Sequence, residues 1–530
     1  MTETTLEQAP VAQERRLFAI NNPASGTEVA RYPLMYREEV DQAIRSARQA
    51  FGSWSHSTFA ERKRILLKAS SFLAENAGNY ADEIVAENGK TRTDALIADI
   101  FTTTHLMKFY AHHAEKYLKP VRRLPGIIIA PLRRCYYKFE PKGVVGVISP
   151  WNYPFTLSAA PVISAVMAGN TVVLKPSSQT TRSGLIVKEV LESGGLPPGV
   201  IQVITGMGSV TGQALIEHEG LDMLFFTGST EVGREVNVRA AEHLIPTILE
   251  LGGKDVSIVT RKADLDRAAH GIVWGCFTNA GQTCIGTEII LVDKAVYRPF
   301  LEKISALTSQ LKLGKESGEV GAMTMTAQLE IVQRQLADAL AKGATIACTG
   351  QGDTQRPGNW FVPTLLTEVS TDMDVFSQET FGPLKPVIPY ESLDEAIELA
   401  NSVEYGLSGS VFTKDMAEGR WIADRLKTGS VNINDVLLTY AIPSLPFGGV
   451  KKSGIGNYHS KSGIRSFTDV KSITETKIPL KREVYWYPMW PNTDLMLEGL
   501  IALLYARKLT KRLSALLSAS KALMGVVFRK

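Results

Sequence analysis

Short apolar runs that each end in Gly, Pro or Ser are the feature that most constrains the fold of this chain. Between residues 143 and 229 they read GVVGVISP, NTVVLKP, VIQVITG and LDMLFFTGS. Segments with helical spacing of apolar residues separate them, among them TLSAAPVISAVMA and SGLIVKEVLESGG. Strands that are apolar throughout and alternate with helices are typical of a parallel sheet covered on both faces. The pattern therefore predicts a doubly wound α/β fold.

A second alternation of strands and helices follows between about residues 250 and 446. Its strand candidates are DVSIVT, EIILVD, ATIAC, LLTEV, GSVFT and GSVNIN. Because 530 residues are too many for one core, we expect two α/β domains. The predicted parts are a disordered leader at 1–18, a first domain at 19–131 and 144–249, a second domain at 250–446, bridging segments at 132–143 and 447–480, and a basic amphipathic tail at 481–530.

Two charged, strand-like stretches fit neither α/β unit. They are LRRCYYKFEPKG at 132–143 and IRSFTDVKSITETK at 464–477. We expect them to pair as a small β excursion that joins subunits.

The composition argues against several functional classes. A formal net charge of +4 is too small to indicate nucleic-acid binding, and we find no zinc-finger or RNP motif. The four cysteines lack C-x-x-C spacing, so we expect no disulfide framework, no metal site and a cytoplasmic location. The sequence has no run of about 18 apolar residues, so we predict no membrane-spanning helix.

Positive charge is concentrated in the C-terminal tail. From Leu495 onward the tail has seven cations and one anion, a net of +6, among many leucines, and Asn492 or Thr493 can cap a helix there. A basic amphipathic helix beside aromatic residues is typical of an interfacial membrane anchor. We therefore expect residues 492–530 to make a peripheral membrane contact, or else to pack on a neighbouring subunit or over the substrate mouth.

Cys284 lies in FTNAGQTCIG, before the strand-like TEIILV. It could be a buried small hydrophobe, half of a disulfide, a metal ligand or a nucleophile. Asn152, beside Trp151 in SPWNYPF, could hydrogen-bond a developing oxyanion, and Glu250 precedes paired glycines, where a carboxylate can swing. Taken alone, a turn asparagine beside a core tryptophan and an exposed glutamate explain these residues at least as well.

Glycines at two predicted strand ends could bind a phosphate group. GMGSVTG and GSTEVG do not match G-x-G-x-x-G, but Gly228, Ser229 and Gly233 stand where backbone amides and a helix N-terminus can meet a pyrophosphate. Lys175, which closes TVVLKP, could donate to a ribose or a phosphate. Plain turns and a solvated lysine are the alternatives.

Seven motifs occur in the order and at about the spacing found in the NAD(P)-dependent aldehyde dehydrogenase superfamily. They are SPWNYPF, KPSSQT, FTGSTEVG, LELGGKD, NAGQTCIG, QETFGP and PFGGVKKSGIG. The resemblance covers roughly residues 20–480, and the chain looks most similar to bacterial members grouped with succinate-semialdehyde and fatty-aldehyde dehydrogenases. It implies a Rossmann-like cofactor-binding first domain, a catalytic second domain, and a homodimer or homotetramer.

The resemblance implies that Cys284 is the nucleophile that attacks an aldehyde, while Asn152 and the Cys284 backbone N–H hold the oxyanion. Glu250 would then activate the water that hydrolyses the thioester to a carboxylic acid. Cys276 matches no motif and is expected in the core. Glu250 disfavours the alternative of a CoA-acylating dehydrogenase, and the intact set of three residues disfavours a non-catalytic membrane-bound scaffold.

For NAD or NADP, the resemblance implies that Lys175 and Glu379 hold the two riboses and that Phe381 packs near the nicotinamide. The surroundings of the pyrophosphate and the adenosine ribose match Trp151, Gly228, Ser229 and Gly233.

Two positions depart from the pattern of many members. Ser178 replaces the acid of the KPSE motif, so a 2′-phosphate is not repelled and NADP becomes admissible beside NAD. Ile289 stands where many members have Arg, which removes a positive group from the expected pocket. We therefore expect a hydrophobic or aliphatic aldehyde or a semialdehyde as the substrate.

Overall fold

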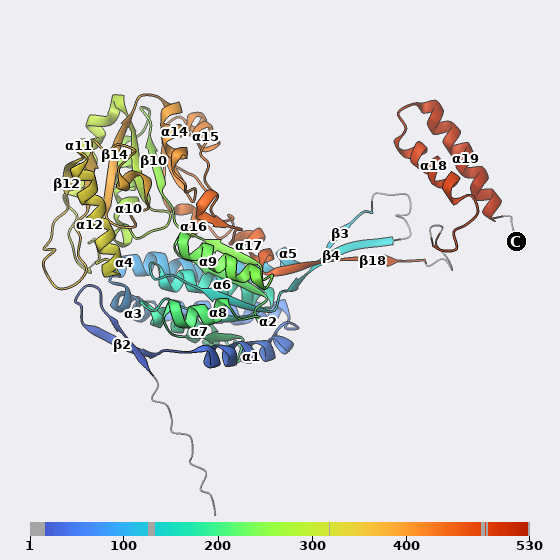
Figure 1. Cartoon of the computed structure of the whole chain (residues 1–530), viewed down its shortest axis with the longest axis horizontal. Helices are drawn as coiled ribbons and strands as arrows, with labels where there is room; N and C mark the ends of the chain where they lie inside the picture. The colour runs from blue at the N-terminus through green and yellow to red at the C-terminus, as the bar shows by residue number, and fades with distance from the viewer. Residues whose placement is uncertain (1–15, 126–132, 317–318, 479–482, 484–485, 528–530) are drawn as a thin grey trace, which may run out of the picture. The chain divides into compact units, whose positions relative to one another are not determined.

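The computed structural model describes residues 16–125, 133–316, 319–478, 483 and 486–527 (Figure 1). The chain divides into two compact units. Unit 1 comprises residues 1–119 and 139–470, and unit 2 comprises residues 120–138 and 471–530. Unit 1 contains two large sheets, as the two alternations of strands and helices predict.

The first sheet of unit 1 has six strands in the order β17-β9-β8-β5-β6-β7. They are parallel except for β17, which is antiparallel to β9. The four apolar runs between residues 143 and 229 are confirmed as strands, whereas β9 and β17 were not expected. The bounds are β5 (Val144–Ile148), β6 (Thr171–Lys175), β7 (Ile201–Val203), β8 (Met223–Thr227), β9 (Thr247–Glu250) and β17 (Gly454–Ile455).

Helices cover both faces of this sheet, as Figure 1 shows for unit 1. Val145 and Val147 of β5 pack in one core, and the alternate residue Val144 packs in another, because successive side chains point to opposite faces. This is why the strands are apolar along their whole length. The first core includes α2 (Phe59–Glu75), α5 (Thr102–Leu118), α6 (Pro154–Ala168) and α7 (Thr181–Ser193), and the second includes α1 (Arg37–Trp54), α8 (Gln213–Ile216) and α9 (Thr230–Glu242).

The second sheet has seven strands in the order β12-β13-β14-β11-β10-β15-β16. They are parallel except for the edge strand β12. The strands are β10 (Asp255–Val259), β11 (Thr287–Asp293), β12 (Thr345–Thr349), β13 (Thr364–Thr367), β14 (Leu384–Tyr390), β15 (Gly409–Phe412) and β16 (Asn432–Ile433). The helices of this part are α10 (Leu265–Phe277), α11 (Tyr297–Thr308), α12 (Thr326–Ala341), α13 (Asp374–Ser377), α14 (Leu393–Ser402), α15 (Met416–Ala423) and α16 (Leu438–Ala441).

Strand β14 is the one large omission from the predicted strands of this sheet. It lies between β13 and β11 although its sequence, LKPVIPY, contains Pro386 and Pro389. Proline has no N–H to give to a ladder, so it normally argues against a central strand.

The N-terminal part of unit 1 begins with a hairpin of β1 (Leu17–Asn21) and β2 (Glu28–Pro33). The predicted leader is therefore two residues too long, because Leu17 and Phe18 pair with Pro33 and Tyr32. Residues 1–15 of that leader lie outside the described residues. Before α5 the chain forms α3 (Ala77–Asn88), a short turn α4 (Arg92–Asp94) and a π-helical segment, η1 (Ala95–Phe101).

Unit 2 contains part of a three-stranded sheet with the order β18-β4-β3. The expected pairing of the two charged stretches is confirmed, because β4 (Arg133–Pro141) and β18 (Thr468–Thr476) are neighbours. The third strand, β3 (Val121–Arg123), had been assigned to the first domain and instead pairs with β4. Residues 126–132 lie outside the described part.

The segment 447–467 was predicted to belong to the bridge, and this is wrong. It contains β17 and α17 (Ser460–Ser466) and is part of unit 1. The reason is aromatic packing, since the buried ring of Phe225 in β8 lies 5.1 Å from the ring of Tyr458 and 6.1 Å from that of Phe467.

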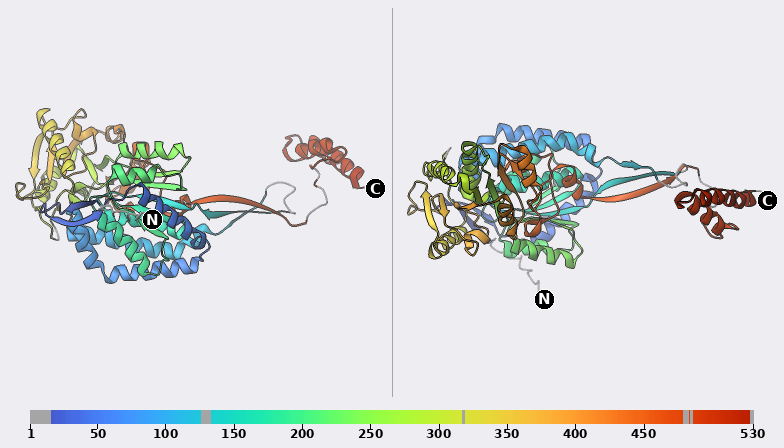
Figure 2. Two further views of the ribbon diagram at one scale, coloured as in Figure 1. Left: turned by 60° about the horizontal axis from the view of Figure 1, so that its bottom comes forward. Right: turned by 90° about the horizontal axis from the view of Figure 1, so that it is seen from above.

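The tail forms two helices, α18 (Thr493–Tyr505) and α19 (Leu509–Val527), which lie side by side as a helical hairpin (Figure 2). A helix does begin at Thr493, but Asn492 makes no capping hydrogen bond with its side chain. Within the residues that the structure describes, no helix is both long and apolar enough to cross a bilayer.

We predict that Phe225→Ala loosens the 458–467 segment from the first sheet. Removing a buried ring that contacts two others typically costs about 3–5 kcal/mol of the free energy of unfolding. Urea unfolding should show a clear fall in the midpoint, whereas Val238→Ala, at an exposed position of α9, should leave it nearly unchanged. Equal midpoints for the two variants would contradict the packing role of Phe225.

Candidate active site

Cys284 lies in a tightly held turn between α10 and β11. Asn279 and Ala280 of this turn have φ angles of 51° and 55°, a left-handed conformation that residues other than glycine adopt infrequently. Gln282 fixes the turn, because its side-chain amide donates to the Asn279 carbonyl at 2.9 Å and its Oε1 accepts from the Thr324 N–H at 2.9 Å. The turn thus presents Cys284 from a rigid backbone.

Asn152 reaches this turn from the loop between β5 and α6. Its side chain is buried, and its Nδ2 donates to the carbonyl oxygen of Gln282 at 3.1 Å. The first and second sheets of unit 1 therefore bring Asn152 and Cys284 together, as the motifs imply.

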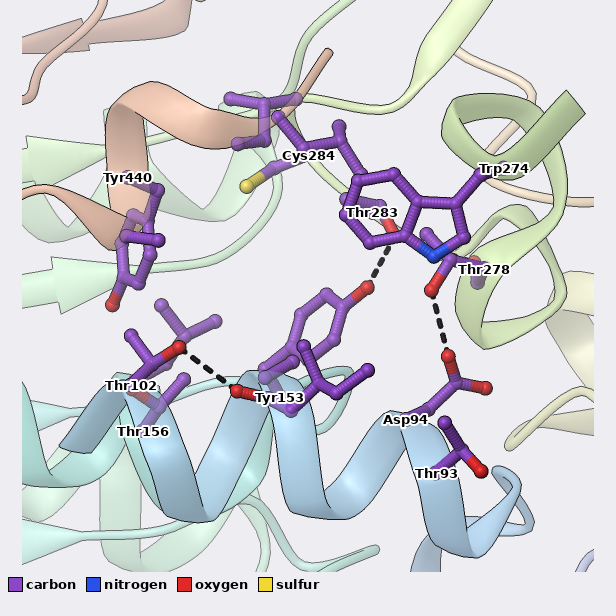
Figure 3. Close-up of a pocket in the computed structure, with 16 residues that line it drawn as sticks. Thr93, Asp94, Thr102, Tyr153, Thr156, Trp274, Thr278, Thr283, Cys284 and Tyr440 are labelled. Carbon is purple, nitrogen blue, oxygen red and sulfur yellow. Dashed lines mark hydrogen bonds between the residues drawn. The ribbon is translucent and has the colours of Figure 1, made fainter. Parts of the chain in front are cut away.

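Cys284 lies between two cavities, and both cavities are lined by it and by Leu157. One cavity has a volume of about 120 Å³ and the other about 540 Å³. In Figure 3 the Cys284 sulfur points into the smaller cavity, near the rings of Tyr440 and Tyr153. A group bound in each cavity could thus approach the same sulfur.

The smaller cavity is lined mainly by apolar surface, together with threonine and tyrosine side chains and one carboxylate. Its aliphatic and aromatic side chains include Ile97, Trp274 and Leu437, and the described residues that line it include no Lys, Arg or His. Asp94 is the carboxylate, and it accepts hydrogen bonds from the hydroxyls of Thr278 at 2.7 Å and Thr91 at 2.8 Å. The cavity therefore suits a neutral apolar molecule better than an anion.

The larger cavity lies at the carboxyl ends of β5, β8 and β9, and the start of α9 lines it. Six of the predicted site residues are in its lining besides Cys284: Trp151, Asn152, Gly228, Ser229, Glu379 and Phe381. The Trp151 and Phe381 rings meet edge to face at 5.4 Å. A Cβ added at Gly252 would lie 2.5 Å from Glu379 Oε2, so glycine lets the Glu379 carboxylate lie close to the backbone here. The size, the helix N-terminus and the aromatic pair fit a dinucleotide.

Three predicted cofactor residues, Lys175, Ser178 and Gly233, are not in the lining of this cavity. Lys175 ends β6 with its Nζ donating to the Pro176 carbonyl at 3.1 Å, and burial lowers its pKa to about 8. Gly233 lies inside α9, where a Cβ would come within 2.3 Å of Leu251. Gly233 thus allows close packing of α9 on the end of β9.

Glu250 ends β9 and lines neither cavity, and burial raises the pKa of its carboxyl well above the usual range. Among the described residues, no hydrogen-bond partner meets either carboxylate oxygen. Burial also raises the pKa of the Cys284 thiol, and the negative charges of Asp255 and Glu250 raise it further. Both groups therefore favour their protonated, uncharged forms.

Sequence reasoning missed a buried cluster around Glu288. Its carboxylate accepts from Lys254 Nζ at 2.8 Å, Lys385 Nζ at 2.7 Å and the Thr380 N–H at 2.8 Å. Burial alone would raise the pKa of Glu288, but the two lysines outweigh this and lower it to about 2. The cluster fixes the turn at Phe381. An acid inside the apolar run TEIILV was the available signal.

The expectation that Ile289 affects the charge of the pocket is wrong. Its side chain is 1% exposed in the core of the second sheet, and it lines neither cavity. Cys276 is buried in α10, as expected. In the described residues, no group of His, Cys, Asp and Glu side chains has a metal-binding arrangement.

Comparisons with known proteins agree with this geometry. A family model described as "Aldehyde dehydrogenase family" matches residues 11–473. The chain is 36% identical to 4,4'-diapolycopene aldehyde oxidase of Methylomonas sp, covering 92% of this chain and 91% of that protein. It is 38% identical to a Mycolicibacterium smegmatis protein named for succinate-semialdehyde dehydrogenase [NADP(+)], covering 88% of this chain and 90% of the relative.

Solved structures of similar length have the same fold. The NAD+ complex of an aldehyde dehydrogenase from Bacillus cereus is 33% identical, with a TM-score of 0.83 over 87% of this chain and 93% of that one. An aldehyde dehydrogenase from Mycobacterium tuberculosis complexed with NAD+ is 32% identical, with a TM-score of 0.83 over 90% of this chain and 98% of that one. With its two sheets, its Cys284 turn and these matches, the chain belongs to the aldehyde dehydrogenase family.

Proposed function

We propose that this chain oxidises a neutral, apolar aldehyde to its carboxylic acid through a thioester on Cys284. It is an NAD(P)-dependent aldehyde dehydrogenase. The observation that carries the mechanism is the position of Cys284 between an apolar cavity and one that fits a dinucleotide.

In the first half of the reaction, the sulfur of Cys284 attacks the carbonyl carbon of the aldehyde. The new C–S bond turns the carbonyl oxygen into an oxyanion, which the Asn152 amide and the Cys284 backbone N–H stabilise. Burial favours the protonated thiol, so its proton must first leave to solvent, and the thiolate that remains is the attacking species. When bound, NAD or NADP would supply the hydride acceptor that oxidation of the thiohemiacetal to the thioester requires.

In the second half, water attacks the thioester carbon and the C–S bond breaks. Glu250 takes a proton from the attacking water and passes it to the departing sulfur, so the thiol and the carboxylate are both restored as the acid leaves. A CoA-acylating enzyme would transfer the acyl group to CoA and needs no base of this kind. The buried carboxylate therefore supports hydrolysis.

The cofactor would lie in the larger cavity with its nicotinamide near Cys284. Phe381 would lie near the nicotinamide, Glu379 would bind a ribose, and the start of α9 with Trp151, Gly228 and Ser229 would face the pyrophosphate and the adenosine ribose. Lys175 lies outside this lining, and its contact with a ribose stays a prediction. Ser178 brings no carboxylate to the adenosine ribose, which supports the use of NADP beside NAD.

Cys284→Ala should abolish aldehyde oxidation and leave cofactor binding intact, because Cys284 supplies the attacking sulfur. Absorbance of the reduced cofactor measures the loss of oxidation, and fluorescence quenching measures whether cofactor binding is retained. Cys276→Ala is the matched control, since that thiol is buried eight residues earlier and should be dispensable for turnover. Retained turnover in Cys284→Ala would overturn the mechanism.

For Glu250→Gln we expect slow hydrolysis of an acyl-enzyme that still forms, because glutamine cannot take the proton from water. Rapid mixing should reveal a burst of reduced cofactor of about one equivalent per site. In the wild type, the deacylation rate should rise with pH through the raised pKa of Glu250, since only its anion is active. Loss of the burst as well as of turnover would assign Glu250 to acylation instead.

The apolar cavity leads us to expect a higher kcat/KM for hexanal than for succinate semialdehyde, since the latter's carboxylate meets Asp94 and no cation. Asp94→Asn should lower the ratio of kcat/KM for hexanal to kcat/KM for succinate semialdehyde by roughly 3- to 10-fold, because it removes a negative charge that repels the substrate carboxylate. Glu302→Gln, an exposed change in α11, should leave the ratio unchanged. A preference for succinate semialdehyde would contradict the proposed substrate class.

The expected homodimer or homotetramer stays a prediction.

We infer that the C-terminal tail docks on an anionic membrane surface. The exposed apolar side chains of the hairpin are Leu495, Leu497, Ile501, Tyr505, Leu509, Leu513, Leu516 and Leu517. Four exposed cations lie at or just after the connection between its helices: Arg507, Lys508, Lys511 and Arg512. In a two-fold contact between two copies of the chain, the same surface of each copy faces the other, so the cations of one hairpin would repel those of its partner. An anionic bilayer satisfies both features.

We expect the full chain to cosediment with vesicles that contain phosphatidylserine at low salt, and less so at high salt. Replacing the four cations of the hairpin by Gln should weaken binding to these vesicles and leave turnover of hexanal unchanged. Deletion of residues 492–530 should abolish binding. Failure of the full chain to bind at low salt, or a changed oligomer on deletion, would favour a subunit contact instead.

A further inference from the structure

A fully buried ion pair lies beneath the loop that carries Asn152. Lys90 Nζ and Asp99 Oδ2 are 2.7 Å apart, and both side chains are 0% exposed. Lys90 follows α3 and Asp99 belongs to the π-helical segment η1. Neither residue lines the cavities beside Cys284, so the pair does not touch substrate or cofactor.

The pair holds the Asn152 loop at two places. Lys90 Nζ donates to the Asn152 carbonyl at 2.9 Å. Asp99 Oδ1 accepts from the N–H groups of Phe155 at 3.1 Å and Thr156 at 3.0 Å, at the start of α6. The carboxylate thus caps the N-terminus of α6, where free N–H groups and the helix dipole favour a negative charge.

Further contacts link Lys90 to the turn that contains Cys284. Its Nζ lies 4.2 Å from the centre of the Tyr153 ring, and the Tyr153 hydroxyl is 2.6 Å from Thr283 Oγ1, one residue before Cys284. The Asn152 carbonyl that Lys90 binds also accepts from Asn279 Nδ2 at 2.8 Å. The backbone of Asn152 is therefore fixed while its side chain faces Gln282.

Stability alone is a weak reason for such a pair. Taking two charges out of water costs several kcal/mol, and well-packed apolar residues can often replace a buried pair without loss. A pair that grips both sides of a loop does, however, fix the position of the side chain on that loop. A displacement of about 1 Å of a group that binds an oxyanion can slow a reaction about 100-fold.

We propose that Lys90 and Asp99 are positioning residues that hold the Asn152 amide where the oxyanion forms. The inference rests on the proposed role of Asn152 in acylation. The buried pair would thus affect the reaction indirectly, through the position of Asn152.

A double-mutant cycle with Asn152 tests this. The variant Lys90→Met/Asp99→Leu removes both charges together, so no unpaired charge is left buried. We expect it to lower the acylation rate about 10- to 100-fold, measured as the first turnover of cofactor reduction, with cofactor affinity unchanged. In an Asn152→Ala background the same pair change should slow acylation by less than about 3-fold, because the group that it positions is gone.

Arg62→Met is the matched control for general loosening of α6. Arg62 is also buried and donates to the Met167 carbonyl at 3.2 Å, at the other end of that helix. It should lower stability and leave the first turnover nearly unchanged. If the double variant does not fold, Asp99→Asn removes the charge with little change of shape, and the same cycle applies to it.

If the pair change slows acylation by the same factor in the wild-type and Asn152→Ala backgrounds, the positioning role is overturned. An Arg62→Met variant that slows acylation as much as the pair variant would overturn it too. If Asn152→Ala itself leaves acylation at the wild-type rate, the proposed oxyanion site fails along with the inference. If Asn152→Ala slows acylation but the pair change has the same effect in both backgrounds, only the positioning role fails and the proposed function stands.

Discussion

The hydrogen bond from the Asn152 amide to the Gln282 carbonyl joins the two halves of the site. Asn152 follows a strand of the first sheet, and Gln282 lies in the turn before a strand of the second. Lys90 and Asp99 hold the first backbone, Thr324 binds the Gln282 side chain on the second, and Asn279 Nδ2 donates to the carbonyls of both Asn152 and Gln282. The two cavities meet at Cys284 as a consequence of this join.

Burial gives the site its chemical character. It raises the pKa values of the Cys284 thiol and the Glu250 carboxyl, so both groups are poised to exchange protons instead of standing permanently charged. The buried carboxylate of Glu288 differs, because it is paired with Lys254 and Lys385 and stays ionised. The carboxyl of Glu250 is thus available for proton transfer, whereas the ionised carboxylate of Glu288 holds the backbone around Phe381.

The sequence predicted much of the fold, because strands buried on both faces are apolar throughout, as in VVGVI and TVVLK. It did not predict β14, whose two prolines conceal a central strand, or the attachment of 458–467, which depends on contact with the distant Phe225. At the site, the motifs around Cys284 and Asn152 were recognisable. The pair of Lys90 and Asp99 was not, since a buried charge can be told from a solvated one only by its distant partners.

The proposed mechanism depends on one covalent intermediate, a thioester between the acyl group and Cys284. The most direct test is mass spectrometry of the Glu250→Gln protein, quenched in acid after mixing with hexanal and cofactor. We expect a mass increase equal to one hexanoyl group, which maps to the peptide that contains Cys284 and is removed by hydroxylamine. An unmodified protein that has nevertheless reduced one equivalent of cofactor, or an acyl group on Cys276 or Cys348, would contradict it.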